Sequence, residues 1–121
     1  MPTQQRLAEF VETVVSGRYI DALREFYADT AEVRENEAVP RIGLEQLISH
    51  ERAFLSTVKE MRTRAAHQVL LNADTVAIHW EFEMTYPDGV ARLFSEVALQ
   101  RWNDRHIVHE QYFYDPGQLR R

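Results

Sequence analysis

The sequence contains no cysteine among its 121 residues, which excludes disulfide bridges and thiolate chemistry. No apolar run approaches the roughly 20 residues of a membrane-spanning helix, so a membrane protein is not expected. The chain also lacks a glycine-rich phosphate loop, internal repeats, low-complexity segments and any metal-ligand spacing of His, Asp and Glu on one element. We therefore expect no dinucleotide, metal or other cofactor.

Charge of one sign is not concentrated in any segment. The formal net charge is −5 and the basic residues are scattered, so the chain has no electrostatic footprint for a phosphate backbone, and nucleic acid is not an expected partner. The first residues, Met1-Pro2-Thr3, show no charged leader followed by an apolar stretch. No secretory signal is therefore expected, and the expected location is cytoplasmic.

The remaining composition is that of an ordinary globular protein, with 45% hydrophobic and 27% charged residues. A chain of this length predicts one domain, spanning residues 1–121, that can bury a real core. In a domain so small, an internal pocket would occupy much of the volume.

Three segments have the apolar spacing of amphipathic helices. Thr3 is placed to cap the first helix and Gly17 to end it. A second, short helix follows Arg18 and is expected to end near Ala28-Asp29. The third is expected over 44–58.

Glu51 lies inside the apolar stripe of this third helix. A charge in that position needs a partner. The favoured interpretation places it at the edge of the stripe, paired with an arginine such as Arg64, while His50 and Arg52 are solvated. The alternative is that Glu51 reaches a cavity.

Two tight turns set the register predicted for the last three strands. The turn Tyr86-Pro87-Asp88-Gly89-Val90 has proline where φ is fixed and glycine where a left-handed residue is needed, and Asn103-Asp104-Arg105-His106 reads as a two-residue loop. The first turn predicts the pairs Met84 with Arg92, Phe82 with Phe94, Trp80 with Glu96 and Ile78 with Ala98. The second predicts Trp102 with Ile107, Gln100 with His109, Ala98 with Gln111, Glu96 with Phe113 and Phe94 with Asp115.

One face of these strands therefore mixes apolar and polar side chains. Its predicted polar members are Glu96, Gln100, His109, Gln111 and Asp115, among apolar residues that include Trp80, Phe82, Phe94 and Phe113. An unpaired buried carboxylate costs several kcal/mol, so these groups either line a cavity that holds a ligand or water or satisfy one another, as His109 could satisfy Glu96. A slip of one residue at either turn would rearrange the set.

The order of elements predicts an α+β domain. Two helices, a short strand over 31–35, a third helix and four long strands give three helices packed on one face of a curved, mainly antiparallel sheet. The opposite face carries Leu93, Val97 and Leu99, and the last strand adds Val108, Tyr112 and Tyr114. A face this apolar is not expected to be left in water, so we predict a homodimer packed through the outer sheet face. The alternative is that a C-terminal tail folds over this face.

Several segments together resemble one known superfamily. They are Ser16-Gly17-Arg18-Tyr19-Ile20-Asp21-Ala22-Leu23, Phe26-Tyr27-Ala28-Asp29, Val33-Arg34-Glu35-Asn36, Pro40-Arg41-Ile42-Gly43, Trp102-Asn103-Asp104, Ile107-Val108 and Tyr114-Asp115-Pro116. Nearly the whole chain thus resembles the nuclear transport factor two-like superfamily, above all its SnoaL-like branch. The resemblance implies a cone-shaped scaffold with a cavity between the helices and the concave sheet face. This superfamily includes isomerases, cyclases, dehydratases, epoxide hydrolases and non-catalytic binders.

The resemblance argues against chemistry of the ketosteroid isomerase type. There an aspartate base is backed by a tyrosine and a protonated aspartate. By similarity the base falls on Glu35, but the two donor positions fall on Phe10 and Ala98. Losing even one such donor typically costs about 2.7–4 kcal/mol.

The SnoaL-type cyclase pattern fits in part. Its general acid/base, a carboxylate at the end of the last strand, falls by resemblance on Asp115. The partner histidine falls on Gln100, although His109 across the ladder could replace it. The epoxide-hydrolase pattern fits least, because Asp115 and Arg92 are present without a second aspartate.

Two functions follow as hypotheses. The first is a cyclase or isomerase acting on a small, largely apolar carbonyl compound, with catalytic residues Asp115, Glu35 and His109 and with ligand-binding residues Tyr27, Trp80, Phe82, Phe94, Glu96, Gln100, Gln111 and Phe113. The second is a non-catalytic ligand-binding or dimerisation module. In that case Asp115 caps the turn at Pro116-Gly117, and Glu35 pairs with Arg34 or Arg41.

Overall fold

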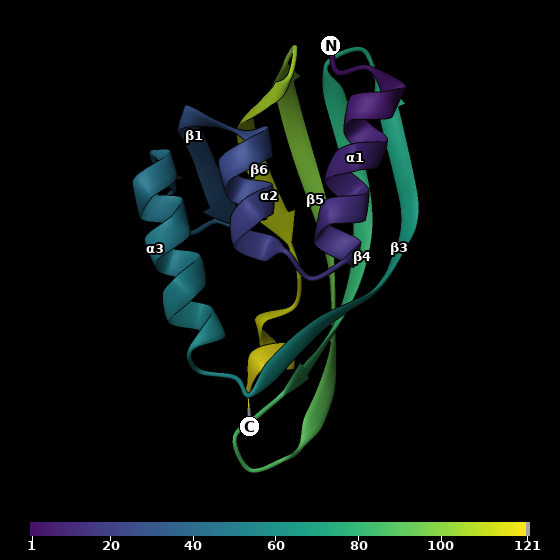
Figure 1. Ribbon diagram of the computed structural model, residues 1–121. Helices are drawn as coiled ribbons and strands as arrows, with labels where there is room; N and C mark the ends of the chain where they lie inside the picture. Colours follow the sequence, from purple (N-terminus) through teal and green to yellow (C-terminus); the bar gives the residue numbers. More distant parts are fainter. Residues whose placement is uncertain (121) are drawn as a thin grey trace.

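Three α-helices and a six-stranded sheet make up the computed structural model, which describes residues 1–120 (Figure 1). The elements follow the order α1 (Gln4–Val15), α2 (Tyr19–Phe26), β1 (Tyr27–Glu35), β2 (Arg41–Ile42), α3 (Leu44–Leu55), β3 (Glu60–Asn72), β4 (Thr75–Thr85), β5 (Ala91–Asn103), β6 (His106–Phe113) and the 3-10 turn η1 (Pro116–Leu119). The α+β prediction is confirmed. In the described part of the chain, no helix has the length and apolarity needed to cross a membrane.

The ends of the helices follow local side-chain chemistry. The Thr3 hydroxyl accepts the backbone N–H of Arg6 at 2.9 Å, and Gly17 takes a φ of +82° just after α1, as predicted. Helix α2 ends at Phe26, before the predicted end, because the chain enters β1 and pairs with β6. Helix α3 ends at Leu55 rather than residue 58. The hydroxyls of Ser56 and Thr57 donate to backbone carbonyls three residues back, each at 2.6 Å, and compete with further helix.

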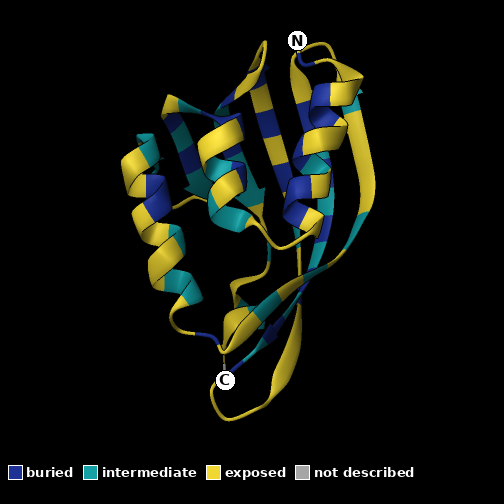
Figure 2. Ribbon diagram, in the orientation of Figure 1, coloured by how far each residue is buried: buried dark blue, intermediate teal, exposed yellow. Residues whose placement is uncertain are grey.

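The strands are ordered β2-β1-β6-β5-β4-β3, and every neighbouring pair is antiparallel except the parallel pair β1 and β6. All three helices lie on one side of the curved sheet (Figure 1). We call the side that they cover the concave face and the other the outer face. Along β4 the concave positions are buried and form the core with α1; they are Val76, Ile78, Trp80, Phe82 and Met84. Figure 2 shows the same alternation of buried and exposed positions along β5.

Arg6 ties three separate parts of the chain together. It is only 5% exposed, and its guanidinium binds the Glu25 carboxylate at 2.8 Å and the Glu25 carbonyl at 2.7 Å. Its Nε–H donates to the carbonyl of Arg105, in the β5–β6 turn, at 3.1 Å. The guanidinium also lies 4.1 Å from the ring centre of Phe26, within the range of a cation–π interaction. The start of α1 is thereby fixed to α2 and to the last hairpin.

The register predicted for β4 and β5 is confirmed. The structure pairs Met84 with Arg92, Phe82 with Phe94, Trp80 with Glu96 and Ile78 with Ala98. Proline and glycine in the turn set this register locally.

The register predicted for β5 and β6 is wrong beyond its first pair. Trp102 pairs with Ile107 as predicted, but Arg101 then pairs with His109, which leaves Val108 as an extra residue in a β-bulge. The pairs that follow are Gln100 with Glu110, Leu99 with Gln111, Ala98 with Tyr112 and Val97 with Phe113. Because a shift of one residue exchanges the two faces of a strand, the bulge turns Glu110 and Tyr112 toward the concave face.

The outer face keeps an exposed apolar group, but its membership differs from the prediction. Tyr112 is absent from it because of the bulge, and Phe113 takes its place. The four exposed side chains, which we call the outer apolar group, are Leu93 (55%), Val97 (40%), Leu99 (41%) and Phe113 (43%). The C-terminal turn η1 does not bury them: the Gln118 side chain instead binds the backbone N–H and carbonyl of Ser95 at 2.8 and 2.9 Å.

Candidate functional site

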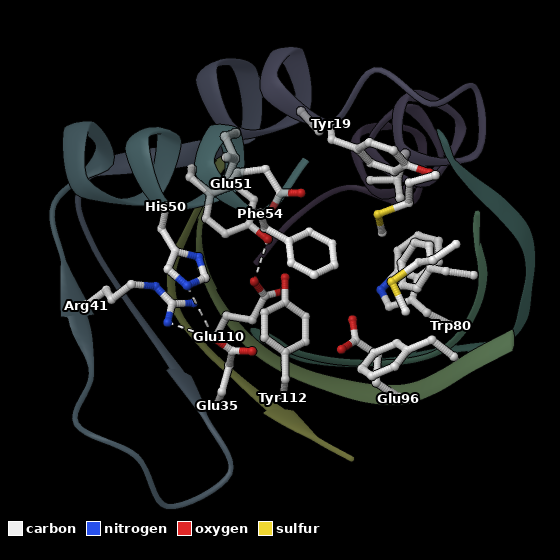
Figure 3. A pocket seen from close by; sticks show the side chains of 18 of the residues that line it. Tyr19, Glu35, Arg41, His50, Glu51, Phe54, Trp80, Glu96, Glu110 and Tyr112 are labelled. Carbon is white, nitrogen blue, oxygen red and sulfur yellow. Dashed lines mark hydrogen bonds and ion pairs between the residues drawn. The ribbon is translucent and has the colours of Figure 1, made fainter. Parts of the chain in front are cut away.

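A cavity of about 300 Å³ lies between the helices and the concave face of the sheet (Figure 3). Its two ends differ in chemistry. The aromatic end is formed mainly by Trp80, Phe82, Met84 and Phe94 of β4 and β5. The polar end is formed by Glu35, Arg41, His50, Glu51, Glu110 and Tyr112, which come from β1, β2, α3 and β6. Such a volume lies at the small end of the range for ligand sites and suits a small molecule.

Glu35 is held in a cluster of charges and hydrogen bonds at the polar end. One carboxylate oxygen accepts from Arg41 Nη1 at 2.7 Å and the other from the Tyr114 hydroxyl at 2.7 Å, while His50 Nε2 lies 3.9 Å away. Burial would raise the pKa of Glu35, but the Tyr114 and Arg41 bonds outweigh it and hold the pKa below its usual value. Glu35 is therefore ionised, and its charge is balanced by Arg41.

Glu110 lines the cavity and belongs to a buried hydrogen-bond network that continues behind the cavity wall. It is 1% exposed and accepts from the Tyr27 hydroxyl at 2.5 Å and from Gln100 Nε2 at 2.6 Å. The Trp102 indole N–H donates to Gln100 Oε1 at 2.9 Å, which leaves the Gln100 amide nitrogen facing Glu110. Burial raises the pKa of Glu110 despite these bonds and a further one with Tyr112.

Glu51 lines the cavity from α3. Within residues 1–120 no hydrogen bond or ion pair reaches its carboxyl, and burial, then the charge of Glu35, raises its pKa to about 7. The favoured pairing with Arg64 is wrong, because Arg64 binds Glu81 and Glu83 on the outer face, each at 3.4 Å. The alternative stated above describes Glu51 correctly.

Glu96 lines the cavity at its aromatic end, opposite Trp80 on the neighbouring strand. Burial, followed by the charges of Glu110, Glu35 and Glu51, raises its pKa well above the usual value. No side chain of the described residues donates to it or forms an ion pair with it. It is the second unpaired carboxyl of the cavity.

Just over half of the sequence-predicted set lines the cavity. Six of its eleven residues do so: Glu35, Tyr27, Trp80, Phe82, Phe94 and Glu96. Gln100 is buried behind Glu110 and orients it.

The remaining four predicted residues lie away from the cavity, and these placements are corrections. The bulge turns His109, Gln111 and Phe113 to the outer face. There His109 lies 3.5 Å from Glu32, Gln111 donates to the Asn36 carbonyl at 2.8 Å, and Phe113 is exposed. Asp115 follows the end of β6 and accepts the Gly117 backbone N–H at 2.8 Å, which caps η1.

The cavity also contains residues that were not predicted for it: Arg41, His50, Glu110 and Tyr112. His50 is half-exposed at the rim, where burial and then Arg41 lower its pKa. The signal for Glu110 was present in the sequence. Gln100 and Trp102 share a face, and a buried glutamine amide needs an acceptor, which a one-residue slip of β6 supplies in Glu110. In the part of the chain that the structure covers, no group of three or more His, Cys, Asp or Glu could hold a metal ion.

The pKa of Glu51 predicts a pH-dependent loss of stability. A carboxyl that titrates near 4.5 when unfolded and near 7 when folded holds its proton more tightly in the folded state. Its contribution to the free energy of unfolding therefore falls as pH rises through this window, by about 3 kcal/mol. Urea unfolding of Glu51→Gln should show a smaller loss of stability over this window than wild type. The exposed Glu45→Gln variant on the same helix is the control, and parallel curves for all three proteins would contradict the prediction.

Comparisons with known proteins identify the family and the fold. A family model described as a SnoaL-like domain matches residues 7–110. No curated protein matches the sequence. Solved structures of similar fold include an NTF2-like protein of unknown function from Burkholderia pseudomallei, with 15% identity, a TM-score of 0.81 and coverage of 95% of this chain and 92% of that one.

Two further structures share the fold. A putative SnoaL-like polyketide cyclase from Mesorhizobium loti has 20% identity and a TM-score of 0.75, with 91% of this chain and 97% of that one covered. TerC co-crystallized with polyporic acid has 13% identity and a TM-score of 0.81, with 95% and 92% covered. At such identities these likenesses concern the fold alone. The family match spans most of the sequence and confirms the predicted resemblance: the chain belongs to the SnoaL-like domain family.

Proposed function

We propose that the cavity binds a small, largely apolar carbonyl compound and moves a proton on it, as a cyclase or isomerase does. The observation that carries this proposal is the carboxyl of Glu51, which lines an aromatic cavity, has no partner in residues 1–120 and has a pKa of about 7. A group of that pKa is present in both protonation states near neutral pH, which suits general acid/base catalysis.

The two ends of the cavity divide the work between binding and chemistry. The rings of Trp80 and Phe82 stack with centres 5.8 Å apart and offer a flat apolar surface to the body of the ligand. The Tyr112 hydroxyl, a hydrogen-bond donor at the polar end, is the group toward which a carbonyl oxygen would point. Burial raises the pKa of Tyr112 well above its usual value, so its hydroxyl keeps its proton.

Glu35 has a different part in this proposal from the one first assigned to it. Arg41 and Tyr114 occupy its two oxygens and lower its pKa, so it is a poor proton acceptor. Its negative charge raises the pKa of Glu51 instead. We therefore assign proton transfer to Glu51 and a tuning role to Glu35.

A second function, ligand binding without catalysis, is favoured by one observation. Two of the four cavity carboxyls, Glu35 and Glu110, have their oxygens occupied by hydrogen bonds within the protein. Only one carboxyl at the polar end, Glu51, is left to act on a substrate. TerC, which shares the fold, has been crystallized with a small molecule, polyporic acid, and binding alone would also account for a cavity of this kind.

Acetophenone, a small aromatic ketone, distinguishes the two functions. Exchange of its methyl hydrogens for deuterium in heavy water, followed by NMR, reports proton abstraction next to the carbonyl. We expect wild type to accelerate exchange as pH rises through about 7, because Glu51 then loses its proton. Glu51→Gln should slow the catalysed exchange on the order of 10²-fold.

Asp115→Asn and Glu45→Gln serve as controls, because both side chains lie outside the cavity. If acetophenone exchanges no faster with wild type than with Glu51→Gln, catalysis by this residue is ruled out. If acetophenone shifts the NMR signals of cavity residues up to a saturating value but no deuterium exchange is catalysed, the binding function is favoured.

We also propose a second copy of this chain as a partner, seated on the outer apolar group. Val97 and Phe113 are cross-strand neighbours, and both stay exposed beside Leu99 with η1 in place. An exposed apolar patch on a sheet is typical of an interface between subunits.

Light scattering coupled to size-exclusion chromatography tests the dimer. Wild type should elute at twice the mass of one chain, and the double substitution Val97→Glu with Leu99→Glu should give a monomer, because two charges would be buried unpaired at the interface. Val39→Glu, at a loop position that is 87% exposed, should leave the dimer intact. A monomeric wild type at high concentration would refute the proposal.

A further inference from the structure

Glu96 stands apart from the other cavity carboxyls and is surrounded by rings. Strand pairing places Trp80 directly opposite it, Phe94 two residues before it on the same face and Phe82 diagonally across. Side chains in these positions lie within reach of one another. Figure 3 shows Glu96 beside Trp80 at the end of the cavity away from Arg41 and His50.

No cation of the described residues compensates this carboxyl. Arg41, the arginine that lines the cavity, lies at the other end and is bound to Glu35 at 2.7 Å. The charged groups that act on Glu96 are three further glutamates, Glu110, Glu35 and Glu51. The aromatic end therefore has a carboxyl without a counter-charge, and a buried carboxyl is stable there only with a proton or a cation beside it.

We propose that the ligand carries a cationic nitrogen, such as a substituted ammonium, that binds at Glu96 among the rings of Trp80, Phe82 and Phe94. Ring faces attract a cation through their quadrupole, and the carboxylate adds a direct charge interaction. Apolar substituents on the nitrogen fit the same rings, whereas a strongly hydrated bare cation would not. A cation in this place displaces the proton that the carboxyl otherwise holds.

This inference rests on the proposed function, because it requires the cavity to be a ligand site. It adds the chemical class of the ligand: a small amine whose polar or carbonyl-bearing part reaches toward Glu51 and Tyr112 at the opposite end. Glu96 is then a binding residue, and proton transfer stays with Glu51.

A pair of probes of equal shape tests the charge alone. Para-hydroxyphenyltrimethylammonium and para-tert-butylphenol differ only in a positive nitrogen in place of a carbon. By calorimetry we expect wild type to bind the cationic probe at least about tenfold more tightly than the neutral one. Glu96→Gln, which keeps the size of the side chain and leaves the rings in place, should reduce that preference several-fold while binding the neutral probe as well as wild type does.

Glu83→Gln is the matched control, because Glu83 lies on the outer face and pairs with Arg62 at 2.8 Å; it should leave both affinities unchanged. If wild type binds the two probes equally, or if the preference for the cationic probe is undiminished in Glu96→Gln, the inference is overturned while the cavity remains a ligand site. Failure of both probes to bind folded wild type would count against the cavity as a ligand site, and the inference would fall with it.

Discussion

The extra residue Val108 in β6 is the constraint on which the site depends. At the bulge, two residues of β6 lie opposite a single position of β5. Every later residue of β6 therefore points to the opposite face of the sheet from the one it would have in a regular ladder. Glu110 and Tyr112 consequently face the helices, and the acceptor needed by the Gln100 amide arrives within 2.6 Å. An unbulged hairpin would bring His109 to the concave face and leave the glutamine without this acceptor.

Within the cavity so formed, hydrogen-bond partners distinguish one carboxyl from another. Burial favours the protonated form of all four glutamates. Glu35 escapes this effect because Arg41 and Tyr114 stabilise its charge, whereas Glu51 and Glu96 have no such partners in the described chain. One cavity therefore contains an ionised carboxylate, a carboxyl that titrates near neutrality and one that holds its proton strongly. The differences arise from the burial of each carboxyl and from the bonds that Arg41 and Tyr114 make to Glu35 alone.

The parts of the fold that were predictable are those that nearby residues determine. The cap at Thr3 and the first hairpin register depend on side chains within a few positions of one another, and both were read correctly from the sequence. The family resemblance was likewise visible in short segments spread along the chain.

The errors have a common physical origin in long-range packing. The turn at 103–106 is compatible with either register of β6, and the bonds of Glu110 to Gln100 across the hairpin and to Tyr27 of the distant β1 favour the bulged one. Glu51 was given the wrong partner for the same reason, since helical spacing says nothing of which strand lies opposite. Asp115 was placed in the cavity because the register error carried over to the end of the strand.

The contacts of Arg6 also bear on how the chain folds. Its side chain joins a carbonyl 99 residues further along the sequence, in the final hairpin turn. During synthesis α1 leaves the ribosome before β5 and β6, yet the contact of Arg6 with the β5–β6 turn forms only after these strands have emerged. Contacts of such long sequence separation slow folding, because the closure of a large loop precedes the gain. Helix α1 is thus synthesised before the hairpin to which Arg6 binds, and until both are in place the apolar side of the sheet that α1 covers is open to other chains.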